Sequence, residues 1–413
     1  MKTKLTKLEK HWILYDIANS AYILLATTII PVLFNSIASS QNLSDDQYLA
    51  YWGYAITAAT LIVALLSPIL GTISDGKGRK KPLFTIFLTI GVLGTFIQPF
   101  IGSWLWFLIV LVITKVGFNG SIVFYDSMLT DITTPERMDD VSSQGYAWGY
   151  IGSCIPFIIS IGLIMFGPKI GLAMNTIMII VFAITAVWWG VLSLPLLKNY
   201  EQKHYVEAIK NPFTGSFKKL KVTLADIAKH KKIKYFLLSF FFYIDGVYTI
   251  ISMATAYGAS LGLDSNGLIL ALLVTQIVAF PCAIFFGKIA KKFKTESLLK
   301  INIIAYALIA CYGVFLEKLY QFWILAVAVG GFQGAIQALS RSYYAKIIPP
   351  EKSGEYFGIF DIFGKGASIT GTLLVSVITS ITGKQNIAIM ALVILFILGY
   401  IFFSLAAKTS KYE

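Results

Sequence analysis

The sequence predicts an all-α membrane protein with twelve transmembrane helices arranged in two six-helix, pseudo-symmetric halves. Of its 413 residues, 57% are apolar and only 13% are charged, about half the charged fraction of a soluble globular chain. Long unbroken apolar runs exclude a β-barrel, whose strands are short and alternate. The composition also excludes disordered, collagen-like and disulfide-rich proteins. The three cysteines lie singly within apolar runs, and we expect no metal and no cofactor.

Apolar runs long enough to cross a bilayer, about 20 residues each, set the number of helices. There are twelve such runs, at 12–38, 48–74, 82–101, 104–129, 143–166, 172–197, 234–259, 264–286, 298–316, 319–341, 354–381 and 384–406. The first run is too long for the apolar part of a cleavable signal peptide. An even number of crossings places both chain ends on the same side of the membrane.

The distribution of basic residues predicts which side that is. Only Lys169, Lys318 and Lys384 lie in the odd-numbered loops, whereas 28 of the 34 lysines and arginines lie in the termini and even-numbered loops. The positive-inside rule then places both termini in the cytoplasm, and we expect the plasma (inner) membrane. The net charge of +13 is therefore explained mainly by the membrane topology. Attraction to anionic membrane lipid is the second explanation. We expect no nucleic-acid partner.

The chain divides into an expected N-terminal bundle at 1–197, a cytoplasmic linker at 198–233 and a C-terminal bundle at 234–413. Within the linker, apolar residues recur at helical spacing among lysines: Leu220, Leu224, Ile227 and Ala228. This pattern suits a helix lying on the inner membrane surface, and it suits a solvated linker helix equally well.

A weak internal repeat supports the two halves. Tyr15-Asp16 in the first run has an echo in Tyr243-Ile244-Asp245 of the seventh run, and Gly71 and Gly287 begin equivalent loops after the second and eighth runs. Parallel six-helix repeats place a substrate site between the halves, near the middle of the membrane.

The loop after the second run carries the most specific motif. Gly71, Asp75, Gly78, Arg79 and Lys80 form the pattern Gly-x3-Asp-x2-Gly-Arg-Lys, which resembles the signature loop of the major facilitator superfamily. Glycine lets two helix ends approach closely and permits a tight turn. The aspartate can cap a neighbouring helix and accept from a basic side chain. We therefore expect a gating latch, rather than a generic positively charged turn.

Further blocks give a narrower resemblance. They are Tyr15-Asp16 to Tyr22, Val141-Ser142 to Gly152, Phe242 to Gly246, Gln276 to Pro281, and Gln337 to Ser342 followed by Ile348-Pro349 and Glu355 to Gly358. Together they resemble the vacuolar amino-acid effluxer branch of the major facilitator superfamily, whose fungal members are linked to autophagy. The resemblance implies the major facilitator fold and transport of a small solute, and it adds Arg341 to the expected gating residues.

Charged residues within the apolar runs are candidates for coupling, because each costs about 2.5 kcal/mol or more at the bilayer centre. Lys115, Asp245 and Lys365 are expected near the midplane, and Asp16, Asp126 and Asp361 nearer the cytoplasmic ends. Asp361 and Lys365 share a helix face and can pair. For each charge a permanent structural ion pair is the alternative. All three histidines fall in cytoplasmic segments, so carboxylates would have to carry any coupled proton.

Polar and aromatic residues on these helices complete the expected substrate site, because a ligand cavity is usually apolar with a few placed polar groups. The additional candidates are Asn19, Tyr22, Asn119, Tyr150, Tyr243, Gln276, Gln333 and Gln337. Helix packing is the alternative role for each of them.

The favoured function is a secondary transporter for a small polar or amphipathic solute, an amino acid or similar metabolite, coupled to a proton or Na+. No phosphate-binding loop for ATP is present in the sequence. The alternative is a polytopic membrane enzyme acting on lipid headgroups, for which the acids at 131–140 are the only candidate cluster. That segment lacks histidine, so we expect no enzyme. We expect the transporter to act as a monomer.

Overall fold

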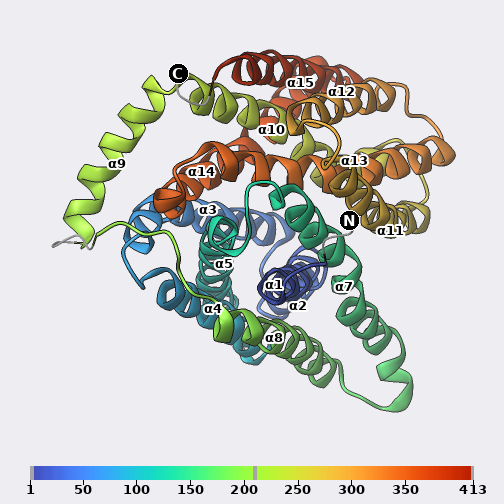
Figure 1. Ribbon diagram of the computed structural model, residues 1–413. Coiled ribbons are helices and arrows are strands. Elements are labelled where there is room, and N and C mark those ends of the chain that lie inside the picture. The colour runs from blue at the N-terminus through green and yellow to red at the C-terminus, as the bar shows by residue number, and fades with distance from the viewer. Residues whose placement is uncertain (1–3, 208–211, 411–413) are drawn as a thin grey trace.

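The computed structural model describes residues 4–207 and 212–410, and every element of regular structure within them is a helix. The first half of the molecule contains α1 (Lys7–Leu24), η1 (Leu25–Ile29), α2 (Ile30–Ser40), α3 (Asp45–Ser74), α4 (Lys80–Ile97), η2 (Gln98–Phe100), α5 (Trp104–Ser127), α6 (Leu129–Ile132), α7 (Met138–Phe166), η3 (Gly167–Ile170) and α8 (Met174–Asn199). These helices gather in the lower part of Figure 1.

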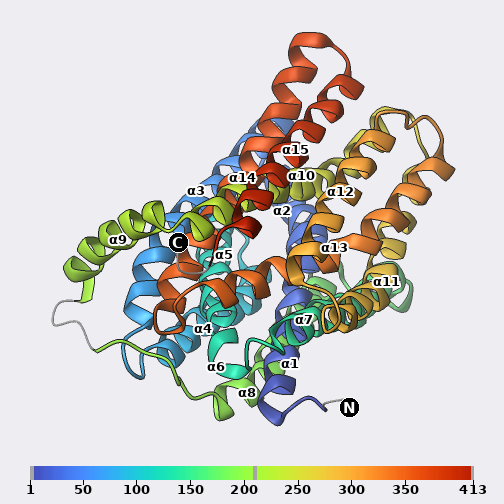
Figure 2. The same ribbon diagram turned by 45° about the horizontal axis from the view of Figure 1, so that its top comes forward.

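The second half contains α10 (Lys231–Ser260), α11 (Ser265–Ile289), α12 (Thr295–Gly313), α13 (Leu319–Ile347), η4 (Pro350–Lys352), α14 (Ser353–Thr382) and α15 (Gln385–Lys408). It occupies the upper part of Figure 1. Between the halves in the sequence, α9 (Pro212–Lys229) lies on the outside of the molecule (Figure 1 and Figure 2). The expected linker helix is therefore present, and its Ile227 is buried whereas Leu224 is half exposed. Residues 208–211 of the linker lie outside the described residues.

Twelve helical segments of the described chain are long and apolar enough to span a membrane, which confirms the predicted fold class. We call the end of the bundle that carries both chain termini and the loops at 75–79, 133–137, 290–294 and 348–352 the terminal end. The other end is the opposite end. The first span is interrupted by the π-helical turn η1 just before Pro31. Proline lacks the amide hydrogen that a regular helix needs, which accounts for an irregular turn there.

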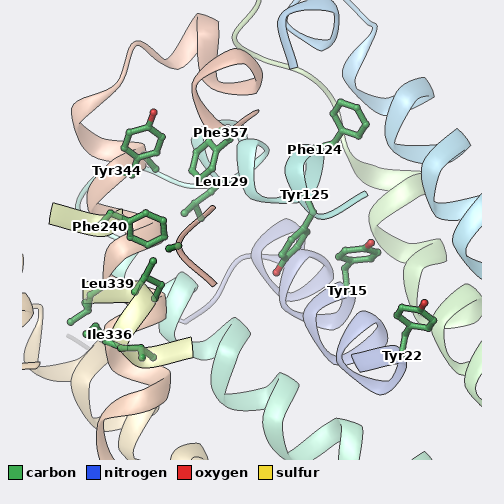
Figure 3. Packing of buried hydrophobic residues seen from close by; sticks show 14 of the residues in the cluster. Tyr15, Tyr22, Phe124, Tyr125, Leu129, Phe240, Ile336, Leu339, Tyr344 and Phe357 are labelled. Atoms are coloured by element: carbon green, nitrogen blue, oxygen red, sulfur yellow. The ribbon is translucent and has the colours of Figure 1, made fainter. Parts of the chain in front are cut away.

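One continuous hydrophobic core runs through both halves, and aromatic pairs pack within each of them (Figure 3). In the first half the Tyr15 and Tyr125 rings lie 4.7 Å apart, and in the second half Tyr344 and Phe357 lie 5.4 Å apart. Such pairs add about 0.5–1.5 kcal/mol each beyond the area that they bury. Aromatic packing therefore helps to hold each half together.

The two halves approach most closely where α3 crosses α14. A Cβ atom added to Gly71 would overlap the backbone oxygen of Gly354, and one added to Gly358 would overlap that of Ser67. Only residues without a Cβ allow this backbone contact. The motif glycine Gly71 thus has the close-approach role that the sequence predicts.

We predict that Gly358→Val separates the halves at the terminal end without unfolding either of them. Overpacking costs about 1–3 kcal/mol, so the ratio of closed to open molecules should fall about 5- to 150-fold. Spin labels at Lys77 and Glu351, both exposed, measure this ratio as a distance distribution after the native cysteines are replaced. Gly53→Val is the control, because nothing lies within 4 Å of the added Cβ position. Unchanged distances in Gly358→Val would contradict the assignment.

Candidate functional site

The side chain of Arg341 of α13 extends from the second half into the first, where each nitrogen of its guanidinium donates a hydrogen bond. Its Nη1 donates to Asp126 at 3.0 Å, and its Nη2 donates to Asp16 at 3.1 Å. Its Nε donates to the Ser142 hydroxyl at 2.9 Å, and Nη2 also reaches the Ser142 carbonyl oxygen at 3.1 Å. The side chain is only 3% exposed. Three helices of the first half, α1, α5 and α7, are thus joined to one residue of the second.

Aromatic rings enclose this guanidinium. Its Cζ lies 4.5 Å from the Trp12 ring centre, 4.4 Å from that of Tyr146 and 5.5 Å from that of Tyr125. Trp12 is itself fixed by a 3.0 Å hydrogen bond from its indole N–H to the Tyr125 carbonyl oxygen. The rings exclude water and add cation–π attraction, so the ion pairs here are stronger than exposed ones. We call Arg341, Asp16, Asp126 and Ser142 the Arg341 lock.

Asp75 forms a second contact between the halves. Its two carboxylate oxygens accept the amide hydrogens of Gly354 and Glu355, at 2.7 and 2.9 Å, at the start of α14. A carboxylate there satisfies unpaired amides and the positive end of the helix dipole. Gly78 has a φ of 70° and forms the predicted tight turn. The predicted capping role of Asp75 is therefore present in the structure.

Lys80 lies beside this cap and is completely buried. Its ammonium group donates to the Ser353 hydroxyl at 2.8 Å and lies 3.5 Å from the Asp131 carboxylate. Asp131 also accepts from Tyr200 at 2.5 Å and from the His204 amide at 2.9 Å. The start of the linker is thus fastened to the same contact.

Two further carboxylates of α7 complete the contact between the halves. Asp139 pairs with Lys346 at 2.5 Å and accepts from the Ser342 hydroxyl at 2.6 Å, whereas Asp140 pairs with Lys291 at 2.7 Å. Lys291 is largely exposed. These pairs lie toward the water, outside the Arg341 lock.

The hydrogen bonds and ion pairs that join described residues of the two halves lie between the terminal end and the middle of the helices. The deepest is a 3.4 Å hydrogen bond from the Gln333 amide to the Tyr150 hydroxyl. Within the described chain we find no such contact in the part of the bundle nearer the opposite end. The polar contacts between the described parts of the two halves therefore lie toward the terminal end.

Lys115 lies midway along α5, twelve residues from Ser127, and forms no ion pair with a described residue. Asn119, one turn along, donates to the Lys115 carbonyl oxygen at 2.8 Å. Both side chains are partly exposed, as is Gln337 of α13. Lys115, Asn119, Ile122 and Asp126 recur at spacings of three and four, so they share one face of α5 that leads to the Arg341 lock.

The other expected coupling residues have separate environments. Asp361 pairs with Lys365, as the sequence predicts, and also accepts from the Ser67 hydroxyl at 2.8 Å. Asp245 pairs with neither Lys115 nor Lys365. Its Oδ1 accepts instead from the Gly371 amide at 2.7 Å.

Several expected site residues lie within one half. Tyr22 packs between Phe118 and Trp189, and Tyr243 bonds to the Ser340 hydroxyl at 2.6 Å. Asn19 donates to the carbonyl oxygen of Tyr15 on its own helix. The side chains of two more form neither a hydrogen bond nor an ion pair with any residue that the structure describes: Gln276 and Arg79. The arginine that joins the halves is Arg341.

The sequence analysis did not identify Trp12 and Lys346, which complete the site, and it assigned no partner to Ser142. Ser142 belongs to a block used for the family resemblance, but nothing in that block indicates a partner 199 residues away. Among the described residues no group of three His, Cys, Asp or Glu side chains could hold a metal ion.

The Asp75 cap predicts a pH dependence of closure. Burial raises the pKa of Asp75 to about 7, although Lys80 and the two capped amides lower it. An exposed aspartate titrates near 3.9, so the closed state binds this proton more tightly than the open state does. The contribution of Asp75 to closure is therefore largest below about pH 4 and is progressively lost as the pH rises to about 7, with no further change above.

We expect spin labels at Lys77 and Glu351 to report a larger closed fraction at pH 5 than at pH 8. Asp75→Asn removes the titrating group and should flatten this dependence, whereas His204→Gln, which alters a nearby imidazole that is partly exposed, should leave it in place. A pH dependence that survives in Asp75→Asn would assign the effect to another group.

Comparison with known proteins agrees with this geometry. A family model described as "Vacuole effluxer Atg22 like" matches residues 6–412. The chain is 44% identical over 406 residues to the uncharacterized MFS-type transporter YxiO of Bacillus subtilis, covering 97% of this chain and 95% of that one. It is 27% identical over 288 residues to Autophagy-related protein 22 of Saccharomyces cerevisiae (strain ATCC 204508 / S288c), covering 60% and 54% of the two chains.

Solved structures show the same fold. The transporter FucP in its outward conformation superimposes with a TM-score of 0.74 at 14% identity, covering 98% of both chains. The proton:xylose symporter XylE gives a TM-score of 0.70 at 12% identity, covering 96% of this chain and 94% of that one. The chain is thus an integral membrane protein that belongs to the Atg22-like family of major facilitator superfamily secondary transporters.

Proposed function

We propose that the chain moves a small polar or amphipathic solute, an amino acid or similar metabolite, by alternating access in the plasma membrane. The Arg341 lock is the observation that carries this proposal, because it joins the halves through polar contacts at one end only. The terminal end faces the cytoplasm, so this conformation is open to the outside. Opening of the lock exposes the path between the halves to the cytoplasm.

The middle of the bundle supports the proposed substrate class. Lys115 is a cation within a membrane-spanning helix and forms no ion pair with a described residue. A substrate carboxylate supplies the counter-charge that such a group needs. Asn119 and Gln337 offer further hydrogen bonds, and the Tyr150 and Tyr146 rings, 6.2 Å apart, offer an apolar surface. This combination suits an amino acid.

The acids near the 131–140 segment support a transporter rather than the alternative lipid-headgroup enzyme. Asp131, Asp139 and Asp140 all take part in ion pairs with lysines. They serve to hold the molecule together, which leaves them poorly placed to act as a general acid or base on a headgroup.

The first test is transport by the reconstituted protein. Counterflow of labelled amino acids in proteoliposomes identifies the solute. Arg341→Gln leaves two buried carboxylates without their partner, a loss of about 3–5 kcal/mol in comparable pairs. We therefore expect net uptake to fall at least tenfold. Lys292→Gln removes an exposed positive charge at the same end and should keep uptake within twofold.

Neutralising the carboxylates as well should recover part of the closed state. In the triple variant Arg341→Gln, Asp16→Asn, Asp126→Asn, no buried charge is left unpaired. A variant Arg341→Gln that transports at the wild-type rate would contradict the role of the lock, whereas no counterflow by the wild type with any amino acid would contradict the substrate class.

A separate prediction concerns orientation. Single cysteines at Ser40 and Lys384, both exposed at the opposite end, should react with a membrane-impermeant maleimide added to intact cells. A cysteine at Lys292 should react only after the cells are opened, because the positive-inside rule places that loop in the cytoplasm. Labelling of Lys292→Cys in intact cells would reverse the assigned topology.

A further inference from the structure

A cavity of about 350 Å³ lies inside the second half, apart from the interface between the halves. Residues of five helices, α10 and α12–α15, line it, all in the part of the bundle nearer the opposite end. Its mouth lies at Ser260, Gly313 and Ser380, and its floor at Thr249 and Val375. Ser260 and Ser380 are exposed, whereas Thr249 is fully buried.

The polar groups of this cavity are not evenly distributed. Its hydroxyl-bearing residues all belong to α10 and α14: Thr249, Tyr257, Ser260, Ser376, Thr379 and Ser380. The walls from α12, α13 and α15 are apolar, among them Ile309, Leu325 and Leu392. A strip of hydroxyls therefore leads along two helices from the mouth to the floor, and water needs such polar partners to enter a cavity.

Asp245 lies one helical turn below that floor. It is completely buried, and its Oδ1 accepts from the Gly371 amide at 2.7 Å and from the Thr249 hydroxyl at 3.4 Å. Its Oδ2 has no hydrogen-bond partner among the described residues. A Cβ atom on residue 371 would overlap both the Asp245 carboxylate and the Thr249 hydroxyl, so glycine is needed for this contact.

No described cation balances the Asp245 carboxylate. The helices packed against α10 carry the following titratable or charged side chains in their membrane-spanning parts: Cys282 and Lys288 of α11; Glu296, Lys300, Tyr306, Cys311 and Tyr312 of α12; Tyr320, Arg341, Tyr343, Tyr344 and Lys346 of α13; Glu355, Tyr356, Asp361 and Lys365 of α14; and Tyr400 and Lys408 of α15. None of them forms a hydrogen bond or ion pair with Asp245 in the described part of the chain, and Arg341, Lys346 and Lys365 pair with other carboxylates.

The chemistry of this site favours a proton over a metal ion. A buried, unpaired carboxylate is costly, and protonation removes the charge. Sodium would need several oxygen ligands, whereas Oδ1 already faces two donors and only Oδ2 is free. We propose that Asp245 is a proton-binding site that exchanges protons with the opposite side of the membrane through this cavity, by a path separate from the solute path.

The Thr249 hydroxyl lines the cavity and donates to Oδ1 of Asp245. In this step it passes its hydrogen to that oxygen and takes up the proton that arrives through the cavity. One O–H bond breaks and one forms at Thr249, and one O–H bond forms at Asp245, so the net change is the addition of one proton to the carboxylate. The proposal rests on the proposed transport function for its role in coupling, since a bound proton can drive solute movement only in a transporter. Its chemistry can be tested without any solute.

The first experiment uses N,N′-dicyclohexylcarbodiimide, an apolar reagent that adds to protonated carboxyl groups, on the full-length protein in liposomes. Mass spectrometry should locate the adduct at Asp245, at least fivefold more abundant at pH 6 than at pH 8 relative to total protein. To block the mouth of the cavity, Ser380→Cys is introduced into a protein without native cysteines and is modified with a bulky maleimide. This modification should slow the labelling of Asp245 at least fivefold. Ile381→Cys, exposed but outside the cavity lining, is the matched control.

Absence of an adduct at Asp245, equal labelling at both pH values, or labelling unaffected by the block at Ser380 overturns the proposal. These results need no transported solute. If Asp245 is labelled as expected but no solute moves, the proposed function fails and the proton site stands.

The second experiment separates the proton path from the solute path. Thr249→Val removes the relay hydroxyl at nearly constant volume, so accumulation driven by a pH gradient should fall at least tenfold while counterflow stays within twofold. Thr249→Ser should restore accumulation. Thr275→Val is the control, because the Thr275 hydroxyl bonds only to the backbone oxygens of Ala271 and Ala326. An equal loss of counterflow in Thr249→Val would make the cavity a solute site, and unchanged accumulation would remove the relay; either result overturns the proposal.

Discussion

One guanidinium joins three helices of the first half to the second half. Arg341 uses its hydrogen-bonding groups on two carboxylates and a serine that all belong to the other half of the molecule. A lysine could not replace it, because the ammonium group lacks the planar fork that serves three helices at once. Separation of the halves removes the partner of each of these charges, so water must solvate them when the lock opens.

Polar contacts make this end suitable for repeated opening. An apolar interface of the same size would resist hydration, whereas each carboxylate and ammonium group here is well solvated once exposed. The ion pairs between the halves also differ in burial, from partly exposed at the surface to buried inside. Lys291 at the surface is 43% exposed, whereas Arg341 inside is 3% exposed. Water can therefore loosen the outer pairs before it reaches the lock, and the cap of Asp75 on α14 ties the loop at 75–79 to the same movement.

Local signals account for what the sequence could predict. The twelve spans follow from apolar length, the Gly78 turn and the Asp75 cap follow from a short motif, and the Asp361–Lys365 pair follows from helical spacing. The Arg341 lock joins residues up to 325 positions apart, and a single sequence has no periodicity at that range. Tyr22 and Tyr243 show the same limit, because an aromatic residue on an apolar helix looks alike whether it faces a cavity or the core of its own bundle. Spacing alone could not decide between these two environments.

The internal repeat explains why the two halves use their acids differently. Tyr15 bonds to Ser121 at 2.8 Å, and Tyr243 bonds to Ser340 at 2.6 Å, so the two tyrosines have equivalent partners within their own halves. In the first half the acid follows the tyrosine directly, and in the second half one residue intervenes. One residue turns a side chain by about 100° around a helix. Asp16 consequently faces the other half and holds Arg341, whereas Asp245 faces α14 within its own bundle. The offset of one residue assigns one acid to closure and leaves the other in a separate, apolar site where a proton can be bound without disturbing the lock.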